Sequence, residues 1–144
     1  PRSIAGDMVC VMRPEHPLAA KATITPEDLR DAPYIALEQG TRMGTIVRRA
    51  FAQADVPFRF SVEVRYCNTA CVLAESGVGV AVVDPLSPVF SGRYDLAIRP
   101  FAPASEVRAS AVRSRKRPIS RAADAFLREV RLVAAETAAK LGSG

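Results

Sequence analysis

Two short polar clusters contain the residue types that proteins use to hold a small charged molecule. The first cluster, Gln39-Gly40-Thr41-Arg42, combines a glycine that lets the backbone approach a ligand, a hydroxyl, and a guanidinium that could pair bidentately with a carboxylate. The second cluster is Tyr66-Cys67-Asn68-Thr69. Both clusters also suit the start of a helix, where Thr or Asn caps free N–H groups and an Arg is solvated. From the residues alone, this capping role is the favoured interpretation of each cluster.

Two carboxylates, Glu38 and Asp84, stand at the ends of predicted strands and could pair with an amino or guanidino group of a ligand. Enzyme chemistry finds little support. The single histidine, His16, lies in an apparent turn, so no cysteine has an evident base. Cys67 and Cys71 are four residues apart, but no second ligand pair is in range for a metal site, and two small packed residues are the simpler interpretation. We expect no catalytic residue, no metal and no cofactor.

The strands and helices that would position these clusters alternate along the chain. Thr41 is the natural cap of a helix that runs to Ala54, and Asn68 or Thr69 would cap a second helix that Gly77 ends. Such alternation is typical of βαβ units, and it predicts an α/β fold with a parallel sheet covered by helices. Strands are predicted over residues 7–13, 34–37, 58–64 and 78–83, and a short helix over residues 25–29.

The last third of the sequence changes character. Two strands are predicted in succession, over residues 94–98 and 106–113, and a long helix capped by Ser120 follows them. An apolar stripe along this helix would dock it onto a sheet. Residues 142–144, Gly-Ser-Gly, are typical of a flexible tail. The stripe consists of Ile119, Ala123, Phe126, Val130, Val133 and Leu141.

Composition limits the class of protein. The chain has 144 residues, of which 49% are hydrophobic and 24% charged, enough for one core without a disulfide or metal. Its three cysteines are an odd number at no framework spacing, which suits a reducing compartment. No apolar run approaches the ~20 residues that span a bilayer, and the start lacks the pattern of a signal peptide. We therefore expect a cytoplasmic protein that does not enter a membrane.

The net charge of +5 raises the question of nucleic acid, but the basic residues are spread along most of the chain. Only Arg113, Arg115, Lys116 and Arg117 form a cluster. This cluster contains no aromatic residue and adjoins a proline, so a solvated turn is favoured over a nucleic-acid patch.

The order of elements and three short motifs resemble the effector-binding domain of LysR-type transcription regulators. The first motif, Arg13 to Ala19 (RPEHPLA), is similar to the strand and His-Pro-Leu-Ala turn of that family. The second, Thr25 to Leu29, resembles its short helix before the second subdomain. The third, Val72 to Pro85 (VLAESGVGVAVVDP), resembles its helix, Gly-x-Gly turn, apolar strand and proline. Each motif is weak by itself, but their order and distances match the family over roughly residues 5 to 135.

The resemblance implies a type 2 periplasmic-binding-protein fold, with two Rossmann-like α/β subdomains and a small effector in the cleft between them. It also implies that the family's helix-turn-helix and the opening of the first subdomain are missing, so DNA would be bound only through a domain absent from this chain. The expected organisation is a remnant of the incomplete first subdomain with the crossover (residues 1–33), the second subdomain (34–90), a return to the first subdomain with the C-terminal helix (91–141), and the tail (142–144).

The function implied by the resemblance is sensing of a small, carboxylate-bearing metabolite, with a homo-oligomer as the expected assembly. In this family the two helix starts of the second subdomain face the cleft, which favours ligand contact over capping alone. A periplasmic solute-binding protein fragment, or an α/β enzyme on the same fold, remains an alternative. The expected ligand contacts are Thr41, Asn68 and Thr69, followed by Glu38, Gln39, Gly40, Arg42 and Asp84.

Overall fold

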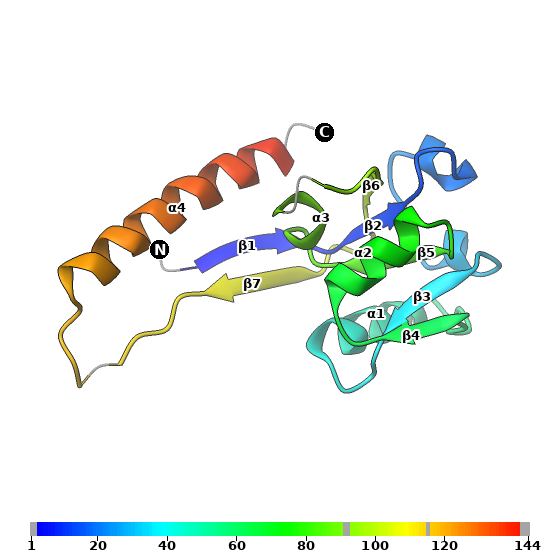
Figure 1. Cartoon of the computed structure of the whole chain (residues 1–144). Helices are drawn as coiled ribbons and strands as arrows, with labels where there is room; N and C mark the ends of the chain where they lie inside the picture. Colours follow the sequence, from blue (N-terminus) through cyan, green and yellow to red (C-terminus); the bar gives the residue numbers. More distant parts are fainter. Residues whose placement is uncertain (1–2, 91–92, 115, 142–144) are drawn as a thin grey trace. The chain divides into compact units, whose positions relative to one another are not determined.

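A computed structural model describes residues 3–90, 93–114 and 116–141 of the chain (Figure 1). The tail predicted at residues 142–144 lies outside the described residues. The chain divides into two compact units, one made of residues 7–106 and the other of residues 1–6 and 107–144. The subdomain boundaries expected near residues 33 and 90 remain a prediction.

The larger unit is built on a five-stranded sheet with the order β4-β3-β5-β2-β6. β3 pairs in parallel with both β4 and β5, whereas β2 is antiparallel to β5 and β6. The sheet is therefore mixed and not wholly parallel as expected, because only α1 and α2 provide the helical crossovers that parallel neighbours require. The strands are β2 (Val9–Met12), β3 (Tyr34–Leu37), β4 (Val62–Val64), β5 (Val80–Val83) and β6 (Ala97–Pro100).

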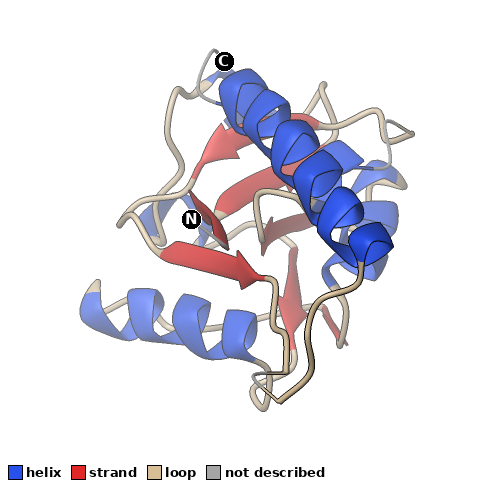
Figure 2. Cartoon of the chain, turned by 90° about the vertical axis from the view of Figure 1, so that its left-hand side faces the viewer, coloured by secondary structure: helices blue, strands red, loops and turns tan. Residues whose placement is uncertain are grey.

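Two helices cover the two faces of this sheet, as Figure 1 and, from the side, Figure 2 show. α2 (Cys67–Glu75) packs its buried Ala70 and Ala74 against Ile35 and Leu37 of β3. Side chains alternate along a strand, so Tyr34 points to the opposite face, where its ring lies 5.9 Å from that of Phe51 on α1 (Arg42–Gln53). Shorter helical segments connect the rest, namely η1 (Pro17–Ala20), η2 (Glu27–Leu29) and α3 (Ser87–Phe90).

The local signals for both main helices are largely confirmed. Thr41 caps α1 as predicted, and Val47, Ala50 and Phe51 form its buried stripe. α2 ends before Gly77, whose φ of +82° is the left-handed conformation that favours glycine after a helix.

The smaller unit combines a two-stranded sheet of β1 (Ser3–Asp7) and β7 (Glu106–Ser110) with the long helix α4 (Arg121–Leu141). Ser120 caps α4 as predicted, because its Oγ accepts a hydrogen bond from the Ala123 N–H at 3.1 Å. The predicted apolar stripe is wrong in part: Phe126 is 66% exposed and Val133 is 48% exposed. The side chain of Leu141 lies outside the described residues.

The face that α4 turns toward the strands is offset from the predicted stripe. Leu127, Val130 and Ala134 line a cavity of about 690 Å³ together with residues of β1 and β7. These three helical positions follow the spacing of one helix face, and Phe126 and Val133 each precede one of them by a single residue. A shift of one residue rotates a side chain by about 100°, which places both of them toward solvent.

Candidate functional site

The carboxyl ends of the three parallel strands meet at one edge of the sheet in the larger unit, because β4, β3 and β5 are neighbours that run in the same direction. In open α/β sheets this edge is where ligands bind. We call it the carboxyl edge and define it as residues 38–42 after β3, residues 65–69 after β4, and Asp84 after β5. The structure places all eight predicted ligand residues on this edge.

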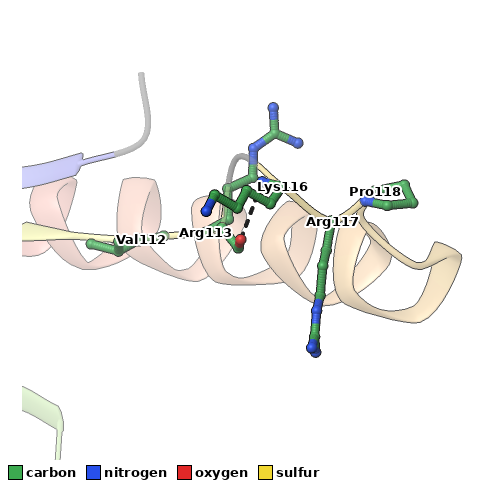
Figure 3. A pocket seen from close by; sticks show the side chains of 7 residues that line it. Val112, Arg113, Lys116, Arg117 and Pro118 are labelled. Carbon is green, nitrogen blue, oxygen red and sulfur yellow. Dashed lines mark hydrogen bonds between the residues drawn. The ribbon is translucent and has the colours of Figure 1, made fainter.

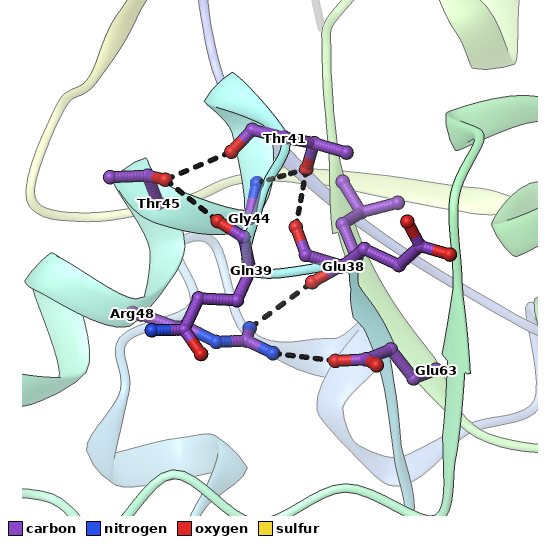
Figure 4. A network of polar contacts seen from close by, with 8 residues as sticks. Glu38, Gln39, Thr41, Gly44, Thr45, Arg48 and Glu63 are labelled. Carbon is purple, nitrogen blue, oxygen red and sulfur yellow. Dashed lines mark hydrogen bonds and ion pairs between the residues drawn. The ribbon is translucent and has the colours of Figure 1, made fainter.

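Thr41 organises the part of the carboxyl edge that follows β3 (Figure 4). Its hydroxyl donates a hydrogen bond to the Glu38 carbonyl at 2.7 Å and accepts one from the Gly44 N–H at 3.0 Å. Thr41 is half-buried, whereas Gln39, Gly40 and Arg42 are exposed. The hydroxyl of Thr41 is thus occupied by the backbone, and its role is to hold the turn that presents the exposed neighbours.

Replacing Thr41 by valine should lower the free energy of unfolding by about 1–2 kcal/mol, because the isosteric side chain loses the helix cap and leaves the Gly44 N–H without its acceptor. Urea unfolding followed by circular dichroism would measure the loss. Thr41→Ser should restore most of it. The matched control is Thr45→Val, because the exposed Thr45 hydroxyl only donates to carbonyls; equal losses in both valine variants would contradict the capping role.

The second polar cluster, residues 66–69, does not cap its helix in the way that we predicted from the sequence. α2 begins at Cys67 with Tyr66 in the capping position, and the Tyr66 side chain makes no capping hydrogen bond. The prediction that Asn68 or Thr69 caps this helix is therefore wrong. Both residues lie in the first turn of α2, where their side chains are exposed. Since the helix does not use them as caps, they remain available to a ligand.

Asp84 is used locally by the chain that follows β5. One carboxylate oxygen accepts hydrogen bonds from the N–H groups of Leu86 and Ser87, each at 2.9 Å, and the other accepts one from the Ser87 hydroxyl at 2.5 Å. Asp84 therefore stabilises the start of α3. Its carboxylate also lies near Cys67, where burial, reinforced by this negative charge, raises the pKa of the thiol to about 12.

An ion pair across the carboxyl edge was missed by the sequence reasoning. A carboxylate oxygen of Glu38 lies 3.0 Å from a guanidinium nitrogen of Arg65, which joins the ends of β3 and β4. The signal that could have found it is register: Leu37 and Val64 are cross-strand partners, so the residues that follow them become neighbours. The negative charge of Glu38 is thereby balanced at this edge.

A second ion pair, between Arg48 and Glu63, also stabilises the carboxyl edge. The Arg48 guanidinium donates to the Leu37 carbonyl at 3.1 Å and pairs with Glu63 at 2.8 Å (Figure 4). It also lies 4.4 Å from the centre of the Phe58 ring. Only 18% of the Arg48 side chain is exposed. Its contacts join α1 to β3 and β4, so Arg48 holds the carboxyl edge together.

Two features of the carboxyl edge suit an anionic ligand. Two helix starts direct N–H groups toward it, and the exposed Arg42 pairs with no carboxylate among the described residues. No group of three metal-ligating side chains occurs in the described part of the chain. Among the described helices, none is long and apolar enough to cross a membrane.

The chain is similar to one family over most of its length. The LysR substrate binding domain matches residues 5–135. The transcriptional activator protein LysR of Escherichia coli (strain K12) is 33% identical over 120 residues, which are 83% of this chain and 39% of that protein. The HTH-type transcriptional regulator DgcR of Pseudoalteromonas sp. is 26% identical over 109 residues, 76% of this chain and 38% of that protein. The chain thus spans about two fifths of these curated relatives, which are transcription regulators and not enzymes.

Solved structures give the same picture of the fold. The effector-binding domain of QuiR in complex with shikimate superposes with a TM-score of 0.64 at 19% identity, over 85% of this chain and 58% of that one. The reduced regulatory domain of OxyR from Pseudomonas aeruginosa has a TM-score of 0.61 at 28% identity, over 90% of this chain and 63% of that one. These domains have the type 2 periplasmic-binding-protein fold, which confirms the predicted fold class.

Proposed function

Because this chain belongs to the LysR-type transcription regulators, whose substrate-binding domain its residues 5–135 match, we propose that its carboxyl edge binds a small, carboxylate-bearing effector. The observation that carries the proposal is the uncapped start of α2, where the exposed Asn68 and Thr69 stand over N–H groups that no side chain among the described residues caps. The partial positive charge of a helix start attracts an anion.

The charges of the carboxyl edge favour an anionic effector over a cationic one. Glu38 is paired with Arg65, and Asp84 is engaged by the start of α3, so neither carboxylate is free to attract an amine. Arg42 is exposed and has a guanidinium that fits a carboxylate bidentately. Two domains of the same fold bind anions: QuiR is in complex with shikimate, a carboxylate, and CcmR of Synechocystis with 2-PG.

In this proposal the chain acts as a sensor inside a cytoplasmic, homo-oligomeric regulator and carries out no catalysis. Effector binding shifts the populations of two conformations, and this shift requires that the effector binds one of them more tightly. The DNA-binding helix-turn-helix would be supplied by another part of the regulator. The regulators named above favour this function over transport by a solute-binding protein.

A thermal-shift screen tests the proposal. The probes are hydroxy acids, aromatic acids and amino acids, each paired with its amide, which lacks the carboxylate charge. A carboxylate present at 100 times its Kd should add about 2.7 kcal/mol to the free energy of unfolding and raise Tm, whereas its amide should not. The double variant Asn68→Ala/Thr69→Ala should abolish the shift.

The matched control is Gln53→Ala, an exposed position in the last turn of α1, far along the helix from Thr41. This variant should keep the full ligand-induced shift. The proposal is wrong if an amide stabilises the protein as well as its acid does, or if the double variant responds like the native chain.

A further inference from the structure

The excess of positive over negative charge is concentrated in one segment of the chain. Residues 107–123 contain six of the 20 basic residues and no acidic residue. Without this segment the chain has 14 basic and 15 acidic residues, a net charge of −1. The six positive charges of this segment, which lie in β7, in the connection between β7 and α4, and in the first turn of α4, therefore account for the positive net charge of the chain.

Four cations of this segment form no ion pair with a carboxylate of the described residues. Arg113, Lys116, Arg117 and Arg121 are exposed, and none of them forms an ion pair within the described part of the chain. We call these four residues the basic segment. Elsewhere the opposite holds, since carboxylates engage Arg13, Lys21, Arg30, Arg48, Arg65 and Arg128.

The geometry of the basic segment suits an extended anion better than a compact one. Residues 111–114 and 116–118 line an open cavity of about 610 Å³. Figure 3 shows that the side chain of Arg117 extends away from those of Arg113 and Lys116. Splayed cations cannot converge on a single phosphate or carboxylate. They can follow a polyanion, and duplex DNA carries one negative charge per ~1.7 Å of its axis.

We propose that the basic segment contacts the phosphate backbone of duplex DNA without reading its sequence. The family supplies the partner, since its members are transcription regulators and one relative is named as an HTH-type regulator. Phosphate contacts position a protein on DNA, whereas base contacts specify the site. The basic segment thus adds affinity beside an operator that another domain selects. This function is independent of effector binding at the carboxyl edge.

Fluorescence anisotropy with a labelled 20-base-pair duplex of arbitrary sequence tests the proposal on the chain as it stands. Arg113→Ala/Lys116→Ala/Arg117→Ala should weaken binding at low salt at least tenfold. It should also reduce the slope of log K against log salt concentration by about 2.7, because three phosphate contacts are lost at ~0.9 each. Circular dichroism would verify that the variant is folded.

The matched control removes three exposed arginines of the larger unit, Arg49→Ala/Arg59→Ala/Arg93→Ala, and so has the same net charge. It should keep most of the affinity and the native slope. Equal losses in the two triple variants would overturn the proposal, since net charge alone would then explain binding. The proposal is likewise overturned if either of two other polyanions binds the chain as tightly as DNA does at equal ionic strength. These are vesicles that contain phosphatidylglycerol, and polyglutamate.

Discussion

Gly44→Ala is expected to destabilise the larger unit by about 3 kcal/mol, because a buried side chain would be forced against backbone that cannot move away. Gly44 is buried in the first turn of α1, where the helix passes over the end of β3. A Cβ atom at this position would lie 2.1 Å from the Glu38 carbonyl oxygen and 2.7 Å from that of Leu37. Glu38 belongs to the carboxyl edge and Leu37 directly precedes it, so relief of the clash would also displace the turn that Thr41 holds.

Urea unfolding of the native chain and of Gly44→Ala, followed by circular dichroism, measures the loss in the free energy of unfolding. Gly40→Ala is the control, because a Cβ atom at Gly40 would meet nothing within 4 Å. This exposed substitution should change the free energy of unfolding by less than about 0.5 kcal/mol. If Gly44→Ala unfolds at the same urea concentration as Gly40→Ala, the close approach of α1 to β3 is incorrect, and with it the geometry of the carboxyl edge.

The elements that the sequence predicted well are those with a strong local cause. β3 has the predicted bounds, because four apolar residues stand between a proline and a polar turn. α1 begins where a threonine precedes a helical repeat of apolar residues, and the Thr41 hydroxyl makes the expected bond to the Gly44 N–H. Neither feature depends on partners that are distant in sequence. The spacing of apolar residues and the capping residue were therefore sufficient to predict β3 and α1.

The predicted strand over residues 58–64 was too long for a reason that lies in tertiary structure. Only Val62–Val64 pair with β3. Phe58 instead packs its ring edge-on to those of Tyr34 and Phe51, with centroids 5.6 and 5.1 Å away, and also contacts Arg48. Alternating apolar residues satisfied the pattern of a strand, but ring packing determined the conformation. A local sequence pattern cannot distinguish a residue that pairs in a strand from one that packs its ring against other aromatic residues.

The segments that form the carboxyl edge were predicted from the sequence, but the structural roles of several single residues on it were not. The position of the carboxyl edge follows from the βαβ order alone, since parallel strands end at the same side. The start of α2 at Cys67 and the pairing of Glu38 with Arg65 depend on register and on tertiary contacts, to which propensities are insensitive. The consequence is a change of roles: Thr41 and Asp84 hold the edge, and Asn68 and Thr69 are left exposed on it.

Cys67 is expected to react with iodoacetamide about 50-fold more slowly than a free thiol at pH 8. A pKa of about 12 instead of 9.0 makes the thiolate about 1,000-fold scarcer, and the greater nucleophilicity of the more basic thiolate offsets roughly 20-fold of this loss. The pKa is raised because burial disfavours the thiolate and because the Asp84 carboxylate lies beside it. Cys10 and Cys71 are buried, so Cys67 is the thiol that the measurement reports.

The pH dependence of the alkylation rate, followed by mass spectrometry of the Cys67 peptide, separates a raised pKa from mere lack of access. With a raised pKa the rate climbs about tenfold per pH unit and still climbs between pH 9 and 10, where a free thiol levels off. A plateau near pH 9 at the rate of a free thiol would instead mean that water reaches Cys67 between α2 and Asp84. The carboxyl edge would then be open at the point where we place the effector, whereas a slow thiol leaves Cys67 as a residue that packs against the hydrophobic core.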